Sequence, residues 1–138
     1  MTLVLDASIT VAAFFADEQT DLTQDVMRRA GAEGSIVPSL WRLEVANVFA
    51  MAVRRKRCDE GYATQSLKRL DQLAVQVDQE TDKHAWGKTR DLSARYGLSI
   101  YDASYLELAI RRGAVLATRD ADLAAAGKKA GIEVVYDR

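Results

Sequence analysis

The chain opens with Leu3-Val4-Leu5-Asp6-Ala7-Ser8, a run of three apolar residues that ends in a carboxylate. Near the other end, Val115-Leu116-Ala117-Thr118-Arg119-Asp120 repeats this arrangement. Each run predicts a buried strand that is followed by a helix. In a parallel sheet, functional groups gather beyond the carboxyl ends of the strands, so we expect Asp6 and Asp120 at the same edge.

Apolar runs of this kind alternate with helical patterns along the whole chain. We expect strands at 2–5, 35–37, 74–77, 114–118 and 132–135, and helices at 7–16, 19–33, 38–57, 59–73, 80–96, 100–112 and 121–130. Pro38 opens its helix, and Gly97 and Gly113 end theirs. This alternation predicts a three-layer α/β/α fold around a central, mainly parallel sheet. Because no repeat, low-complexity tract or linker interrupts the pattern, residues 1–138 are predicted to form a single domain.

The composition is that of an ordinary globular protein, with 49% apolar and 28% charged residues. No apolar stretch approaches the roughly 20 residues of a membrane span, and no signal peptide is expected. The single Cys58 favours a reducing, cytoplasmic setting. The net charge of −1 disfavours binding of nucleic acid by bulk electrostatics. A nucleic-acid substrate would therefore need a local basic patch or a brief catalytic encounter.

Four acidic residues fall where a charge is costly: Asp6, Glu44, Asp102 and Asp120. Burying an unpaired carboxylate is unfavourable, so such groups are normally paired or bound to metal. Since the sequence offers no matching buried cation, the four together predict a divalent metal site. Mg²⁺ and Mn²⁺ suit it because hard ions prefer oxygen ligands. A carboxylate cluster that holds one or two such ions can orient a water for attack on a phosphodiester.

Glu44 is the most diagnostic of the four acids, because no cap explains a carboxylate inside a helix. The apolar arc of helix 38–57, which also holds Glu44, consists of Leu40, Trp41, Val48 and Met51. Asp102 likewise shares a face of its own helix with Tyr105, Leu106 and Ala109. The alternative for Glu44 is a shallow edge of the core or an ion pair with a basic side chain.

The three aspartates each have an alternative role at a helix start. Asp6 stands where an N-cap residue is favoured. Ser99-Ile100-Tyr101-Asp102 fits a capping box. Either Asp120 or Asp122 can stabilise the N-terminus of the last helix, so the choice between these two as the metal ligand stays open.

Other chemistries have few candidate residues. His84, the one histidine, is predicted to be exposed, and with Cys58 it cannot supply a zinc site or a convincing nucleophile–base pair. No glycine-rich nucleotide-binding motif is present. The cluster Arg54-Arg55-Lys56-Arg57 fits either the C-terminal dipole of its helix or a contact with a phosphate backbone. Arg119, beside Asp120, is the better candidate for contacting a substrate phosphate.

In the motifs that contain these acids, the chain resembles PIN-domain proteins, specifically the VapC toxin type of toxin–antitoxin ribonuclease. The resemblance covers essentially the whole chain and rests on four motifs, 3–8, 38–47, 98–103 and 116–123. It implies a PIN fold, a Mg²⁺- or Mn²⁺-dependent endoribonuclease, a VapB-type antitoxin as partner and a homodimer. The residues implied as metal ligands are Asp6, Glu44, Asp102 and Asp120, with Ser8 or Thr118 as a supporting hydroxyl and Asn47 in support of the ligands.

Two other functions compete with this hypothesis. One keeps the PIN fold but makes the protein a repair or RNA-maturation nuclease. The other is a non-enzymatic α/β binding module whose acids only cap helices. A phosphatase with Asp6 as nucleophile is disfavoured, because Ser8 stands where such enzymes carry a second aspartate.

Overall fold

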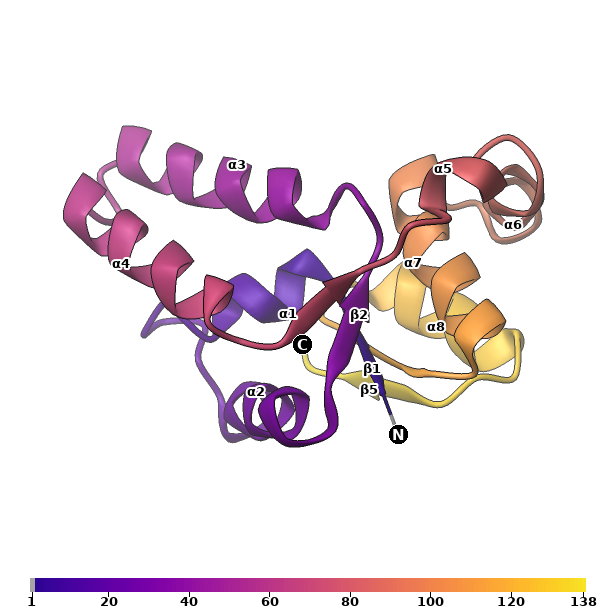
Figure 1. Ribbon diagram of the computed structural model, residues 1–138, viewed down its shortest axis with the longest axis horizontal. Coiled ribbons are helices and arrows are strands. Elements are labelled where there is room, and N and C mark those ends of the chain that lie inside the picture. The colour runs from indigo at the N-terminus through magenta and orange to yellow at the C-terminus, as the bar shows by residue number, and fades with distance from the viewer. Residues whose placement is uncertain (1) are drawn as a thin grey trace.

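The centre of the protein is a parallel sheet, seen in a computed structural model that describes residues 2–138 (Figure 1). Within these residues its five strands are β1 (Leu3–Leu5), β2 (Ser35–Val37), β3 (Val75–Val77), β4 (Val115–Thr118) and β5 (Val134–Tyr136). Their spatial order is β3-β2-β1-β4-β5, and every neighbouring pair is parallel. The predicted fold class is therefore confirmed.

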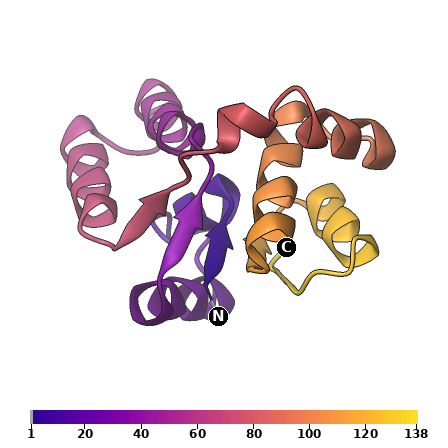
Figure 2. The same ribbon diagram turned by 45° about the vertical axis from the view of Figure 1, so that its right-hand side comes forward.

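Helices cover both faces of this sheet. They are α1 (Ala7–Ala12), α2 (Asp21–Glu33), α3 (Trp41–Arg54), α4 (Glu60–Asp71), α5 (Thr81–His84), α6 (Lys88–Tyr96), α7 (Ile100–Arg112) and α8 (Ala121–Lys129). Figures 1 and 2 show α2, α3 and α4 to one side of the strands and α5 to α8 to the other. Among the helices of residues 2–138, none combines the length and the apolar character that crossing a bilayer requires.

The order of the strands creates a crevice. The chain runs outward from β1 to β2 and β3, then returns to place β4 on the other side of β1. Leu3 pairs with Val115 and Leu5 with Ala117, so β1 and β4 end side by side. Open parallel sheets bind ligands at such a switch point, beyond the carboxyl ends of the strands. The fold therefore directs attention to the residues that follow β1 and β4.

The core explains why the central strands are almost wholly apolar. Strands β1, β2 and β4 are fully buried, whereas the edge strands β3 and β5 are only half-buried. Helix α7 packs against β1 and β4 and is buried from Ala103 to Ala109. Strands covered on both faces lose the apolar–polar alternation of a surface strand, which is the pattern that the sequence shows.

Several predicted boundaries are wrong, each for a local reason. The expected helix 80–96 is two helices, because Gly87 adopts φ −109° and ψ −102° outside the helical region. Helix α3 begins at Trp41, since residues 38–40 form a turn in which the Pro38 carbonyl accepts the Trp41 amide at 3.0 Å. Strand β5 begins late because the Ile132 amide still bonds to the Gly127 carbonyl at the end of α8, at 3.1 Å.

Helix α1 is also shorter than predicted and ends at Ala12. The amide of Phe14 bonds to Val11 instead of continuing the helical pattern, and the chain turns so that Phe15 is buried. The predicted stops at Gly97 and Gly113 are confirmed, because both residues adopt the left-handed conformation that glycine tolerates best.

Candidate active site

A cleft of about 300 Å³ opens at the carboxyl ends of β1 and β4. It brings together all four acids singled out from the sequence, and its lining consists of Asp6, Ala7, Ser8, Glu44, Asn47, Val48, Asp102 and Asp120. The acids come from four places in the fold: the end of β1, the first half of α3, and the starts of α7 and α8. The predicted convergence on one sheet edge is thus found in the structure.

Asp6 is the most deeply placed of these acids, with 5% of its surface exposed. Its Oδ2 accepts hydrogen bonds from the Ser8 hydroxyl at 2.6 Å and the Thr118 hydroxyl at 2.7 Å. Burial raises the pKa of Asp6 and the charge of Asp120 adds to this, while the two hydroxyls act in the opposite direction. Although Asp6 stands at the N-cap position of α1, its side chain makes no capping bond, so the capping alternative is wrong here.

The two hydroxyls also tie the ends of β1 and β4 to each other. The Ser8 hydroxyl accepts the Arg119 amide at 3.0 Å, and the Thr118 hydroxyl accepts the Asp120 amide at 2.9 Å. The family resemblance implied either Ser8 or Thr118 as a supporting hydroxyl, and both hydroxyls hydrogen-bond to Asp6. Asn47 lies on the rim of the cleft and is exposed.

Glu44 is half-buried beside the core rather than inside it. The buried face of α3 consists of Trp41, Val45, Phe49 and Ala52, so the predicted apolar arc is displaced, and Glu44 lies at its shallow edge. The hydroxyl of Tyr105 on α7 donates to Glu44 Oε1 at 2.5 Å. Burial raises the pKa of Glu44 and the charge of Asp6 adds to this, against the effect of the Tyr105 hydrogen bond.

Asp102, at the start of α7, also has a raised pKa. Burial, together with the charges of Asp120, Asp6 and Glu44, raises its pKa from 3.8 to about 6. The Ser99 hydroxyl caps α7 by accepting the Asp102 amide at 3.1 Å. The carboxylates therefore repel one another across the cleft, which is the electrostatic condition under which a cation binds favourably.

Asp120 combines the two roles that the sequence left open. It lines the cleft, and its Oδ1 also caps α8 by accepting the Leu123 amide at 2.9 Å. Asp122 is exposed in the first turn of α8 and lies outside the cleft lining. The geometry favours Asp120 over Asp122 as a member of the site.

The acids fit a divalent cation by their chemistry, although their side chains are not gathered into a finished site. Within residues 2–138, no three His, Cys, Asp or Glu side chains lie close enough to form a ready-made metal cluster. Asp6, Glu44 and Asp120 are each held by a protein donor. The ion pairs found in the same residues nevertheless include none of the four acids, so a set of oxygen ligands without a basic partner faces one open cleft.

Comparison with known proteins identifies the family. The family model described as PIN domain matches residues 3–129. This chain belongs to the PIN domain family. Ribonuclease VapC3 from Pyrobaculum aerophilum is 30% identical over 128 residues, which cover 90% of this chain and 93% of that protein. The resemblance to the VapC type is thereby confirmed.

Solved structures share the fold of this PIN domain. The crystal structure of PAE2754 from Pyrobaculum aerophilum superposes with a TM-score of 0.71 at 24% identity, over 99% of this chain and 89% of the other. The structure of VapBC2 from Rickettsia felis, bound to a DNA fragment from their promoter, gives a TM-score of 0.67 at 15% identity, over 99% and 98% of the two chains.

Arg119 does not face the cleft of this PIN domain. Its guanidinium donates to Glu18 Oε2 at 3.0 Å and to the backbone carbonyl of Arg138 at 2.9 Å. These bonds tie the β4–α8 connection to the chain end and to the loop after α1. The geometry therefore lends no support to the predicted contact between Arg119 and RNA.

A second group of buried acids was missed from the sequence. Asp78 and Glu107 are 5% and 4% exposed, and both pair with Arg111, at 2.7 Å and 2.8 Å. Burial acts to raise the pKa of Asp78, but hydrogen bonds from Arg111 and Thr81 outweigh it and hold that pKa below its ordinary value. The spacing of Glu107 and Arg111 by one helical turn was the available signal. Because these acids have a basic partner, they differ from the four in the cleft.

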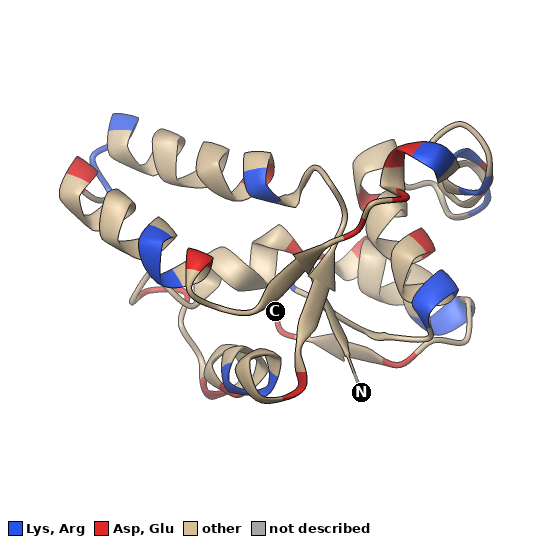
Figure 3. Ribbon diagram, in the orientation of Figure 1, with Lys and Arg blue, Asp and Glu red and all other residues tan. Residues whose placement is uncertain are grey.

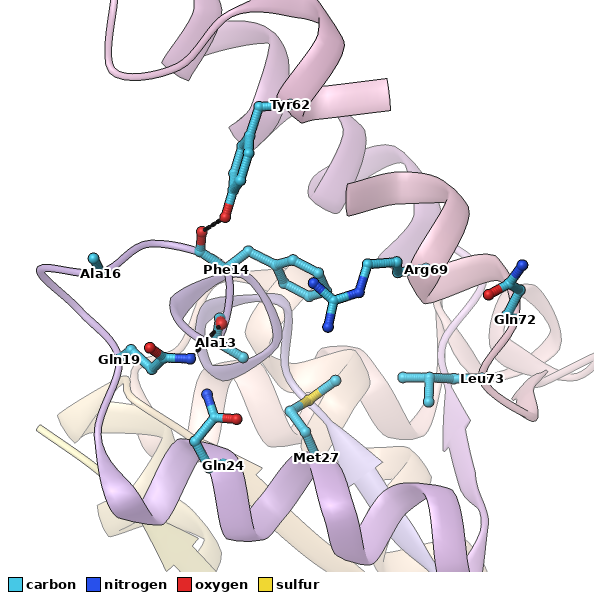
Figure 4. A pocket seen from close by; sticks show the side chains of 10 residues that line it. All are labelled: Ala13, Phe14, Ala16, Gln19, Gln24, Met27, Tyr62, Arg69, Gln72 and Leu73. Carbon is cyan, nitrogen blue, oxygen red and sulfur yellow. Dashed lines mark hydrogen bonds between the residues drawn. The ribbon is translucent and has the colours of Figure 1, made fainter. Parts of the chain in front are cut away.

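Elsewhere, basic residues occupy the last turns of α3, α4 and α8 (Figure 3), where they suit the negative end of the helix dipole. A separate pocket of about 440 Å³ lies between the loop after α1 and helices α2 and α4 (Figure 4). Figure 4 shows Phe14, Met27 and Leu73 in it with the guanidinium of Arg69, and no carboxylate lines it. His84, expected on the surface, is only partly exposed. Of these two cavities, the cleft at the carboxyl ends of β1 and β4 is the one whose lining residues suit a metal ion.

Proposed function

We propose that this PIN domain is a Mg²⁺- or Mn²⁺-dependent endoribonuclease that acts as the toxin of a VapBC toxin–antitoxin pair. One observation carries the proposal: four carboxylates from separate elements, none of them in an ion pair within residues 2–138, share the cleft at the switch point of the sheet. The name of its relative, Ribonuclease VapC3, supports RNA as the substrate.

Asp6, Glu44, Asp102 and Asp120 would hold the ion in this proposal. When bound, a divalent ion orients a water and stabilises the charge that develops on the phosphodiester. The hydroxyls of Ser8 and Thr118 hold the Asp6 carboxylate by hydrogen bonds of 2.6 and 2.7 Å to its Oδ2. Asn47 offers an exposed carboxamide on the rim, where it can hydrogen-bond to RNA.

The proposed partner is a VapB-type antitoxin, supported by the fold shared with VapBC2 of Rickettsia felis. A homodimer is also proposed. Its support is the resemblance to the VapC type, which implies such a dimer. An RNA substrate and the single cysteine support a cytoplasmic location.

Two measurements on the purified protein, first stripped of metal with EDTA, test the proposal. Calorimetry with Mn²⁺ should detect binding in the low-millimolar range or below, whereas acids that only cap helices should bind none. Asp6→Asn should retain the circular dichroism spectrum but lower RNA cleavage about 100-fold or more, on the scale of losing one group that stabilises a transition state.

Asp91→Asn is the matched control, because Asp91 is an exposed acid in the first turn of α6, outside the cleft. It should cleave RNA at the wild-type rate. Asp122→Asn, compared with Asp120→Asn, decides which of these two neighbours serves as a ligand. Cleavage of RNA by Asp6→Asn at the wild-type rate would contradict the assignment of Asp6 to the catalytic site.

A further inference from the structure

Tyr105 is a buried polar residue whose hydroxyl points at an acid of the cleft. Its side chain is fully buried in the middle of α7. A buried tyrosine hydroxyl needs a hydrogen-bond partner, because leaving it unpaired costs free energy. Here the partner is Glu44 Oε1, at 2.5 Å. The short distance is that of a bond to a charged acceptor, which is stronger than a bond between neutral groups.

This bond also joins two helices that otherwise share little. Among the side-chain hydrogen bonds of residues 2–138, it is the one that connects α3 with α7. The other polar links of α3 lead elsewhere: Trp41 donates to Thr10 on α1, and Arg42 bonds to Asp71 on α4. Tyr105 is therefore the polar link between Glu44 and the α7 side of the cleft.

The bond also gives the two oxygens of the Glu44 carboxylate different surroundings. Oε1 is occupied by the tyrosine hydroxyl, and no hydrogen bond to Oε2 is found within residues 2–138. Glutamate has several rotatable bonds, so an untethered Glu44 would lose conformational entropy when it binds a ligand. Fixing one oxygen in advance removes part of that cost and leaves the other oxygen for the cleft.

We propose that Tyr105 is a positioning residue that fixes Glu44 for the divalent ion, an inference that rests on the function proposed above. Tyr105 acts through Glu44 and does not touch the substrate. Carboxylate ligands are commonly oriented by a hydrogen bond of this kind, and losing it weakens metal binding about 10- to 100-fold.

The test is Mn²⁺ calorimetry of wild type, Tyr105→Phe and Tyr101→Phe. Phenylalanine keeps the ring and removes only the hydroxyl. Tyr105→Phe should bind Mn²⁺ about 10- to 100-fold more weakly than wild type. Tyr101 is the matched control on the same helix, because its side chain is 65% exposed and outside the cleft. Its variant should bind Mn²⁺ as wild type does.

Cleavage assays separate positioning from general damage. In Tyr105→Phe the Mn²⁺ concentration for half-maximal cleavage should rise by the same factor as the dissociation constant. At saturating Mn²⁺, cleavage should largely recover. A loss of cleavage that extra Mn²⁺ does not restore, with unchanged Mn²⁺ affinity, would overturn the proposal.

A double-mutant cycle tests whether Tyr105 acts through Glu44. In a Glu44→Ala background, where no acceptor remains for the hydroxyl, Tyr105→Phe should weaken Mn²⁺ binding by less than about twofold. Equal effects in both backgrounds would contradict the inference. If Tyr105→Phe does not fold, Glu44→Asp serves instead, because the shorter side chain draws the carboxylate away from the hydroxyl and should weaken binding similarly.

The outcomes also distinguish this inference from the proposed function. If wild type binds no Mn²⁺, the proposed metal centre fails, and the role of Tyr105 fails with it. If wild type binds Mn²⁺ and cleaves RNA but Tyr105→Phe binds Mn²⁺ equally well, the inference alone is overturned and the proposed function stands.

Discussion

Replacing Asp102 by asparagine is expected to stabilise the metal-free protein at pH 7. Burial, with the charges of Asp120, Asp6 and Glu44, raises the pKa of Asp102 from 3.8 to about 6. The folded protein therefore binds a proton at Asp102 more tightly than the unfolded chain does. Stability is greatest when this acid is protonated, and it is lost as the pH rises from about 4 to about 6. Asparagine carries no charge at any pH, so the variant should not lose this stability as the pH rises.

The size of the effect follows from the pKa shift. A shift of about 2 units corresponds to about 3 kcal/mol. Because Asp102 is only half-buried, solvent screening reduces this to about 1–2 kcal/mol. For a chain of 138 residues, that difference raises the melting temperature by about 4–8 °C.

Thermal melts in EDTA, at several values between about pH 5 and pH 8, measure the effect. The gain in Asp102→Asn over wild type should be largest above pH 7 and shrink towards pH 5. Asp91→Asn controls for the loss of one negative charge in the first turn of a helix. If Asp102→Asn melts at or below the wild-type temperature at pH 7, or if the gain does not depend on pH, repulsion within the cleft is refuted.

Three further predictions concern stability. Arg111→Met should lower the free energy of unfolding by about 3–5 kcal/mol in urea denaturation, because it leaves the carboxylates of Asp78 and Glu107 buried without a basic partner; a loss below about 1 kcal/mol would contradict this. Thr20→Ala should cost about 1 kcal/mol, since Thr20 forms a capping box with Thr23 at the start of α2; an unchanged urea midpoint would speak against it. Mn²⁺ at about 100 times its dissociation constant should stabilise wild type by about 2.7 kcal/mol, and a melting temperature that ignores Mn²⁺ would count against the metal site.

Patterns among neighbouring residues were enough to predict the central strands and two of the helix ends. The apolar runs at 3–5 and 115–118 became the central strands, because strands covered on both faces must be apolar throughout. Gly97 and Gly113 ended helices as expected, because the left-handed conformation is a property of the residue itself. The helix predicted over 80–96 was broken at Gly87, where the backbone adopts a conformation that helical periodicity does not reveal.

The candidate site was predicted in part. Asp6 and Asp120 could be named because strand ends mark them in the sequence, whereas Glu44 was named from an apolar arc of its helix that the structure displaces. Tyr105 was counted only as an apolar neighbour of Asp102, since a pattern of spacing does not show where a hydroxyl finds its partner. Asp78 and Glu107 were overlooked because the depth of a side chain depends on what the rest of the chain packs over it.

The sequence by itself determined the alternation of strands and helices, the helix stops and the carboxylates at the ends of β1 and β4. These features depend on interactions between residues a few positions apart. Tertiary structure decided which carboxylates have a basic partner and which face each other without one. It also decided that the hydroxyl of Tyr105 meets Glu44, a residue 61 positions away in the chain. The physical reason is that burial and charge–charge distance belong to the packed molecule, and no short stretch of sequence contains them.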